Sequence, residues 1–80
     1  MKNKEKLERA GWLYDCPWGN KKEYEVYGRK NIRIVYDPIR DLPLVFYNIS
    51  ERHNYVMGVI TDFRFELFCE PLEDEKEKRN

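Results

Sequence analysis

Apolar and polar residues alternate along most of the chain between Trp12 and Cys69. A period of two is typical of strands that bury one face, whereas a helix repeats its apolar residues every three to four positions. The pattern therefore predicts an antiparallel meander of five or six short strands, separated by turns. The predicted strands cover residues 12–15, 23–27, 31–36, 44–49, 55–61 and 63–69.

Glycine, proline, asparagine and charged residues separate these strands. Pro17 and Gly19-Asn20 predict a turn over residues 16–20, and Gly28 begins a hairpin loop over residues 28–31. The segment 37–43 contains two prolines and is predicted to be the longest irregular part of the domain. Residues 50–54 are predicted to form a further polar turn.

The first ten residues predict a short helix. Lys4 to Ala10 are good helix formers, Asn3 is a suitable N-cap, and Gly11 suits the left-handed conformation that ends many helices. The apolar stripe is narrow, with Leu7 and Ala10 as its main members. An isolated helix of this length is marginal in water, so we expect it to pack on the strands.

Residues 55–68 have two interpretations. Val56, Val59, Ile60, Phe63 and Leu67 also fit the apolar stripe of a helix. The alternation and the β-branched and aromatic content favour strands, which we adopt as the prediction.

The expected fold is a single α+β domain over residues 1–70, in which the N-terminal helix packs on an antiparallel five- or six-stranded β-meander. Residues 71–80 are nearly all charged and are predicted to form a frayed tail. The predicted core residues are apolar residues of the strands: Leu13, Val26, Ile32, Ile34, Leu44, Phe46, Val59, Phe63, Phe65 and Leu67.

Composition excludes several classes of protein. The chain has 80 residues, enough for one domain, and its 15% aromatic content argues against disorder despite 38% charged residues. Fifteen basic side chains balance fifteen acidic ones, so no net charge attracts nucleic acid or acidic membranes over long range. No apolar run approaches the roughly 20 residues of a membrane span, and the N-terminus lacks the apolar centre of a signal peptide. We therefore expect a cytoplasmic protein.

Residues suited to catalysis or metal binding are few. Cys16 and Cys69 are the two cysteines and His53 is the one histidine, which is too few for a structural zinc site of four ligands. We expect both cysteines to be thiols in a reducing compartment, with a disulfide as the alternative if the protein is exported. His53 lies near Ser50 and Glu51, but these residues fit a polar turn better than a catalytic triad. We expect neither an enzyme nor a bound cofactor or metal.

Basic and aromatic residues alternate in the segment 21–36, which raises the alternative of a single-stranded nucleic-acid-binding sheet. Its basic residues are Lys21, Lys22, Arg29, Lys30 and Arg33, and its aromatic residues include Tyr24 and Tyr27. In a hairpin of residues 23–27 and 31–36, Tyr27 and Arg33 would share a face. Glu23 and Glu25 on that face, together with the zero net charge, place this hypothesis second.

Binding of another protein is the function that the sequence favours. Tryptophan, tyrosine and arginine dominate interface energies, and Trp18 lies at a predicted turn. Prolines stiffen the segment 37–43, which lowers the entropy lost on binding. We expect a stand-alone protein-binding domain, for example a small inhibitor or modulator encoded by a virus or mobile element, with homodimerisation through a sheet edge as a further option. The predicted contact residues are Trp18, Tyr27, Arg29, Lys30, Arg33, Ile39, Arg40 and Leu42.

Overall fold

The computed structural model describes residues 2–50 and 56–70, which form an α+β domain with an N-terminal helix and an antiparallel sheet, as predicted. The sheet has five strands in the order β1-β2-β3-β4-β5, so each strand pairs with the next in the chain. The predicted tail 71–80 and most of the predicted turn 50–54 lie outside the described residues. The elements are α1 (Asn3–Arg9), β1 (Leu13–Trp18), β2 (Tyr24–Arg29), β3 (Ile32–Asp37), β4 (Leu42–Asn48), β5 (Val56–Val59) and α2 (Asp62–Phe68).

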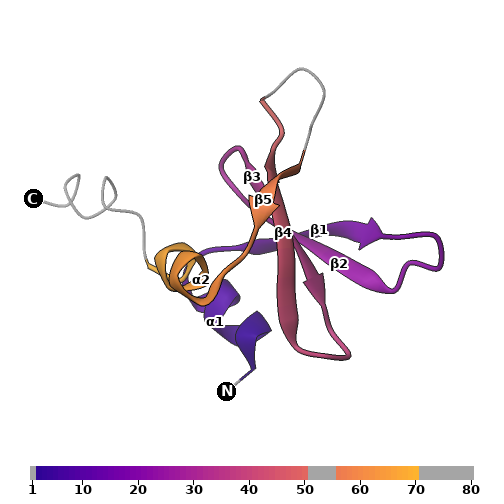
Figure 1. The fold of residues 1–80 in the computed structure, drawn as a ribbon, viewed down its shortest axis with the longest axis horizontal. Helices are drawn as coiled ribbons and strands as arrows, with labels where there is room; N and C mark the ends of the chain where they lie inside the picture. The colour runs from indigo at the N-terminus through magenta and orange to yellow at the C-terminus, as the bar shows by residue number, and fades with distance from the viewer. Residues whose placement is uncertain (1, 51–55, 71–80) are drawn as a thin grey trace, which may run out of the picture.

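The sheet is strongly twisted, and the two helices lie together at one side of it (Figure 1). In this view β1 and β2 run across the picture, whereas β4 runs up it. The main core lies between the sheet and the helices, since residues of both helices pack with alternate residues of β2, β3 and β4. Its buried members are Leu7, Ala10, Trp12, Tyr27, Ile34, Tyr36 and Phe46, and the partly buried Ile32, Ile60, Phe65, Phe68 and Cys69 pack against them.

Trp12 joins the two helices in this core. It follows α1 after Ala10 and Gly11 and is 1% exposed. Its indole Nε1 donates a hydrogen bond to the carbonyl oxygen of Phe68 at 2.7 Å, and the two rings meet edge to face with centroids 5.4 Å apart. The same Phe68 ring packs edge to face on Phe46 of β4. The end of α2 is thereby fixed both to the start of β1 and to the middle of the sheet.

The predicted last strand, residues 63–69, is wrong, because this segment forms helix α2. The side-chain oxygen of Thr61 accepts a hydrogen bond from the backbone nitrogen of Arg64, which caps the helix. Phe65 and Phe68, three positions apart, turn towards the core. Phe63 and Leu67 face solvent and are 71% and 47% exposed, so their assignment to the core is also wrong.

Turns are shorter than predicted. Strand β1 continues through Pro17 to Trp18, where a turn was expected over residues 16–20. Proline is tolerated there because β1 is an edge strand with one side unpaired. Strand β3 continues to Asp37 and β4 begins at Leu42, so the irregular segment between them is only 38–41.

The sheet face opposite the helices carries a continuous apolar row. Each member of the row pairs with the next across neighbouring strands: Cys16, Val26, Val35, Val45 and Val59. The central members Val26 and Val35 are buried at 0% and 1% exposure, whereas Val59 on edge strand β5 is 67% exposed. Leu13 on edge strand β1 is likewise exposed. Edge positions on this face have neighbours on one side only, which explains why the prediction of Leu13 and Val59 as core residues is wrong.

Candidate functional site

The predicted contact residues separate into two ends of the sheet. Trp18, Ile39 and Arg40 lie at the end that carries the β1–β2 and β3–β4 loops. Lys30 and Arg33 belong to the β2–β3 hairpin at the opposite end. Leu42 is 48% exposed, but it lines a different hollow, of about 330 Å³, with residues of α1 and α2. The predicted residues therefore do not form one continuous surface.

Tyr27 and Arg29 take part in holding the fold together. Tyr27 is 1% exposed, and burial, assisted by a hydrogen bond to the Glu25 carboxylate, raises the pKa of its hydroxyl above the usual range. Arg29 donates hydrogen bonds to the carbonyl oxygens of Ala10, Phe68 and Glu70 at 3.0, 3.2 and 2.7 Å. A buried phenol and an arginine bound to three backbone carbonyls are poorly placed to meet a partner.

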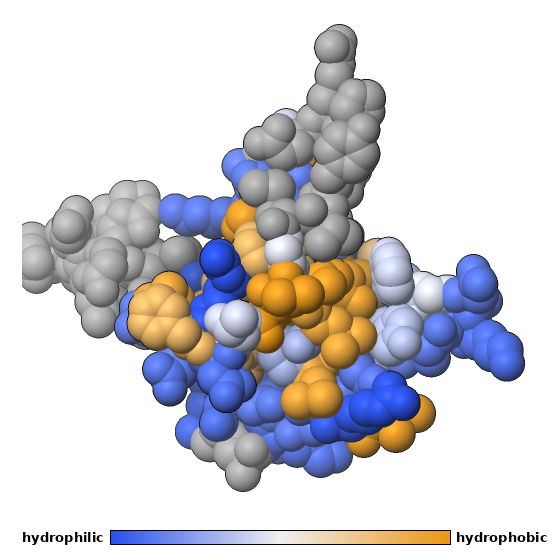
Figure 2. Space-filling view, viewed as in Figure 1, coloured by the Kyte–Doolittle hydropathy of each residue, from blue (hydrophilic) through white to orange (hydrophobic). Residues whose placement is uncertain are grey.

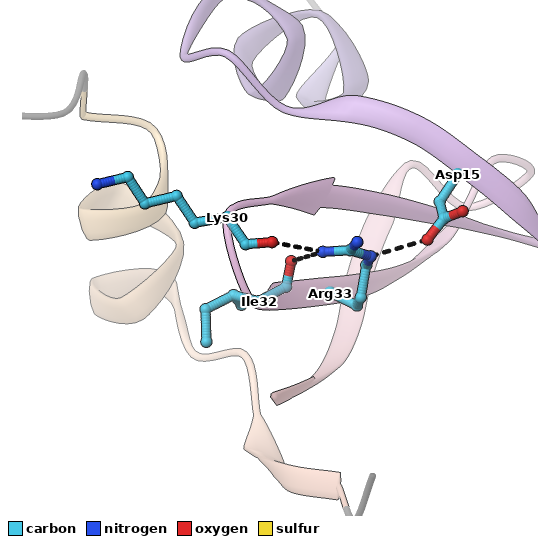
Figure 3. Close-up of polar contacts among 4 residues, drawn as sticks. All are labelled: Asp15, Lys30, Ile32 and Arg33. Atoms are coloured by element: carbon cyan, nitrogen blue, oxygen red, sulfur yellow. Dashed lines mark hydrogen bonds and ion pairs between the residues drawn. The ribbon is translucent and has the colours of Figure 1, made fainter. Parts of the chain in front are cut away.

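Arg33 is also held in place, by its own hairpin and by β1 (Figure 3). Its Nε donates to Asp15 Oδ2 of β1 at 2.8 Å, and its Nη1 donates to the carbonyl oxygens of Lys30 and Ile32 at 2.8 and 3.0 Å. The register pairs Gly28 with Arg33 and Tyr27 with Ile34. Adjacent positions of a strand point to opposite faces, so the expectation that Tyr27 and Arg33 share a face is wrong.

The other end of the sheet presents what we call the sheet-end face, formed by Trp18, Tyr24, Ile39 and Arg40. Trp18 and Tyr24 are paired in the register of β1 and β2, and their ring centroids lie 5.8 Å apart. Tyr24 then lines a hollow of about 150 Å³ together with Glu23, Asp37, Ile39 and Arg40. The aromatic pair and the β3–β4 turn are therefore neighbours, although they are distant in the sequence.

Asp37 fixes the conformation of this turn from within. It is 3% exposed, and its Oδ1 accepts hydrogen bonds from the backbone nitrogens of Ile39 and Arg40 at 3.0 and 3.1 Å. Its Oδ2 accepts a hydrogen bond from Arg40 Nη1 at 2.9 Å. The hydrogen bond from the Arg40 backbone nitrogen is the main cause that lowers the pKa of Asp37. An aspartate followed by proline favours this kind of turn, so the pair Asp37-Pro38 marks Asp37 in the sequence as the residue that orders the turn.

Asp41 attaches the same turn to the N-terminus of α1. Its backbone has a φ of 57°, and its Oδ1 accepts hydrogen bonds from the backbone nitrogen of Asn3, at 2.9 Å, and from the Tyr36 hydroxyl. Asn3 was expected to cap α1 but is its first residue. Its side-chain amide donates a hydrogen bond to the Asp41 carbonyl oxygen instead of capping the helix. The hydrogen bond from Tyr36 lowers the pKa of Asp41.

The result is an apolar side chain displayed on a fixed turn. Ile39 is 87% exposed, and Trp18 is 46% exposed. Figure 2 shows an apolar patch beside strongly hydrophilic residues at the lower margin of the molecule, where the β3–β4 turn lies in Figure 1. Tyr24 belongs to this face but is absent from the predicted contact residues, because its proximity to Ile39 depends on the pairing of β2 with β3.

Residues 2–50 and 56–70 contain no group of three or more His, Cys, Asp and Glu side chains able to hold a metal ion, and neither of the helices in these residues has the length and apolar character of a membrane span. Cys16 is an exposed free thiol and Cys69 a partly buried one. The predicted combination of Ser50, Glu51 and His53 falls largely outside the described residues. Comparison of the chain with family models, curated proteins and solved structures finds no match.

Proposed function

We propose that this protein is a non-enzymatic binding domain that recognises a partner protein through the sheet-end face. The observation that carries the proposal is the 87% exposure of Ile39 on a turn whose backbone is held by Asp37 and Asp41. A single exposed apolar residue is common on protein surfaces. Here it is combined with an aromatic pair and an arginine, which are the residue types that contribute most at interfaces.

The rigidity of the turn supports the same function. Binding costs roughly 0.5–1.5 kcal/mol for each flexible side chain that becomes ordered, and ordering a loop adds to this. The backbone of Ile39 and Arg40 is already ordered in the free protein by the Asp37 carboxylate. A partner would therefore meet a surface that is formed in advance.

Nucleic-acid binding through the segment 21–36 has weaker support. Tyr27 is buried, and Arg29 and Arg33 donate hydrogen bonds to groups of the protein itself. Tyr24 is the other aromatic residue expected to stack on bases. It lies on the sheet-end face, at the opposite end of the sheet from Lys30 and Arg33.

Affinity capture from a lysate of the source cell, with the protein immobilised, tests the proposal. Trp18→Ala and Ile39→Ala are each expected to reduce recovery of the partner by about tenfold, equivalent to about 1.4 kcal/mol. Ile49→Ala is the matched control, because Ile49 is also exposed, at 40%, but follows the opposite end of β4. Equal recovery by all three variants, or no specific partner with the unaltered protein, would contradict the proposal.

A second variant separates the role of the turn from that of the side chain. Asp37→Ala keeps Ile39 but removes the acceptor of its backbone hydrogen bond. We expect faster amide hydrogen exchange at Ile39 and Arg40 and weaker capture of the partner, while exchange in β2 is unchanged. Unchanged exchange at these amides would show that the carboxylate does not order the turn.

A further inference from the structure

The carboxylates of Glu23 and Asp37, beside the sheet-end face, accept hydrogen bonds from the backbone of their own loops. Glu23 is exposed, but its carboxylate accepts a hydrogen bond from the backbone nitrogen of Lys21 at 2.9 Å and lies against Gly19, where an added Cβ would come within 2.8 Å of its Oε1. Asp37 is buried beneath the β3–β4 turn, where it accepts hydrogen bonds from that turn. Both carboxylates thus serve to order the loops that contain them.

The basic groups of these loops point outward. Lys21 and Lys22 are exposed in the β1–β2 loop. The Arg40 side chain is 71% exposed even though its Nη1 pairs with Asp37 at 2.9 Å. One nitrogen of the guanidinium is held, which orients the group, and most of its surface stays accessible. An oriented guanidinium matches the two oxygens of a carboxylate better than a mobile ammonium does.

From this arrangement we infer that the partner segment bound at the sheet-end face is acidic, and that it places a carboxylate on Arg40 and an adjacent apolar or aromatic side chain against Ile39 and Tyr24. The inference rests on the proposed function and specifies the chemistry of the partner. The hollow of about 150 Å³, which Tyr24, Ile39 and Arg40 line together with Glu23 and Asp37, has room for one such side chain. Lys21 and Lys22 lie in the neighbouring loop, where they favour further acidic residues on the partner by electrostatic complementarity.

A short acidic segment fits this face better than a long polyanion. Fifteen basic and fifteen acidic residues leave the chain without net charge, so attraction is confined to the neighbourhood of the basic loops. Binding along a nucleic-acid backbone needs contacts to several successive phosphates. A peptide needs a single carboxylate at Arg40 and one side chain in the hollow.

Selection from a random peptide display library tests the inference directly. The unaltered protein is expected to enrich peptides in which Asp or Glu adjoins an aromatic or aliphatic residue, and Arg40→Glu is expected to lose these peptides. A synthetic peptide of the enriched sequence should bind roughly tenfold more weakly to Arg40→Gln and to Ile39→Ala. Arg9→Gln, which alters an exposed arginine of α1, should bind it unchanged. Circular dichroism verifies that each variant is folded.

The outcomes distinguish this inference from the proposed function. Peptides that depend on Ile39 but neither contain acidic residues nor depend on Arg40 would overturn the inference and leave the proposed function standing. Peptides whose binding is unchanged by Ile39→Ala and by Trp18→Ala, or no enrichment at all, would count against both the inference and the proposed function. Single-stranded oligothymidylate serves as the competing probe. If it binds more tightly than the peptide and this binding is lost in Arg40→Gln, the acidic-peptide inference is wrong and the face binds nucleic acid.

Discussion

The guanidinium carbon of Arg29 lies 4.8 Å from the centroid of the Trp12 ring, a cation–π contact between β2 and the residue before β1. The same guanidinium donates to the carbonyls of Ala10, at the end of α1, and of Phe68 and Glu70, at the end of α2. Helix C-termini carry partial negative charge and unpaired carbonyls, so a cation there stabilises both helices. Arg29 thereby secures the helical layer to the sheet.

Removal of this side chain should destabilise the whole domain. Arg29→Ala is expected to lower the free energy of unfolding by about 2–3 kcal/mol, the range for a charged group that loses its hydrogen bonds. Arg29→Lys should recover part of the loss, because it keeps the charge but not the planar fork. Urea denaturation measures both effects. Arg9→Ala, at an exposed position, should change stability by about 0.5 kcal/mol or less; if the two alanine variants are equally stable, Arg29 does not have this role.

Gly28 and Arg33 should be energetically coupled across β2 and β3. A Cβ at position 28 would lie 2.7 Å from the Arg33 guanidinium carbon, so Gly28→Ala must displace that side chain from Asp15. We expect Gly28→Ala and Arg33→Ala each to cost about 1 kcal/mol, from lost hydrogen bonds. In the double variant the two costs should not add, because the side chain that obstructs the new methyl group is gone. Additive costs in urea denaturation would show that the two residues do not interact.

Acid should release the contact between Asp41 and Tyr36. The pKa of Asp41 is lowered in the folded protein, chiefly by the Tyr36 hydroxyl, so its stabilising effect is present above the unfolded value of about 3.9 and disappears as pH falls through the lower folded value. The stability difference between the unaltered protein and Asp41→Asn should therefore be constant above about pH 5 and shrink below about pH 4. Asparagine tolerates the left-handed backbone at this position, which avoids a separate strain.

Tyr36→Phe provides the control for this pH dependence, since it removes the donor and leaves the carboxylate. In a protein that already carries Tyr36→Phe, Asp41→Asn should lower the free energy of unfolding by less at neutral pH than it does in the unaltered protein. The pKa of Tyr36 is raised, mainly by burial, so the contribution of its neutral hydroxyl is complete below about pH 10 and is lost as pH rises further. If the unaltered protein and Asp41→Asn differ in free energy of unfolding by the same amount at pH 3 and pH 7, the acid effect does not come from the Asp41 carboxylate.

The two thiols should differ in reactivity. Cys16 is exposed on edge strand β1, whereas Cys69 is partly buried against the core and burial raises its pKa. Thiolates are the reactive form, so Ellman's reagent should modify Cys16 at least about tenfold faster than Cys69 at neutral pH. Comparison of Cys16→Ser with Cys69→Ser assigns the two rates. Similar rates in both variants would indicate that the α2 end opens readily.

The central strands and the first helix were predictable because their local signals agree with their tertiary environment. Strands β2 and β3 alternate apolar and polar residues over part of their length, β4 is apolar on both faces, and Ile34 of β3 and Phe46 of β4 are buried. Gly11 adopts a φ of 96° immediately after the C-cap of α1, as its position in the sequence indicated. In these elements, propensity and burial favour the same conformation.

Helix α2 was not predictable from alternation, because its aromatic residues fit both periods. Phe63, Phe65 and Leu67 alternate, while Phe65 and Phe68 lie on one side of a helix. Packing decides in favour of the helix over the strand. Phe68 contacts Trp12 and Phe46, and the Arg64 guanidinium carbon lies 4.7 Å from the centroid of the Phe46 ring. Those contacts depend on residues that are distant in the sequence.

The candidate site, like the fold, was predictable only in part. The sequence placed Trp18 at a predicted turn and Ile39 and Arg40 in the segment 37–43 with its two prolines, and all three side chains are exposed. Tyr27, Arg29 and Arg33 have equally suitable side chains, but the fold uses them internally. The sequence by itself determined the alternation, the turns and the chemical types of residue, because these depend on near neighbours. Only the tertiary structure decided which of the charged and aromatic side chains stay accessible, because this depends on which carbonyls, carboxylates and rings the folded chain places beside them.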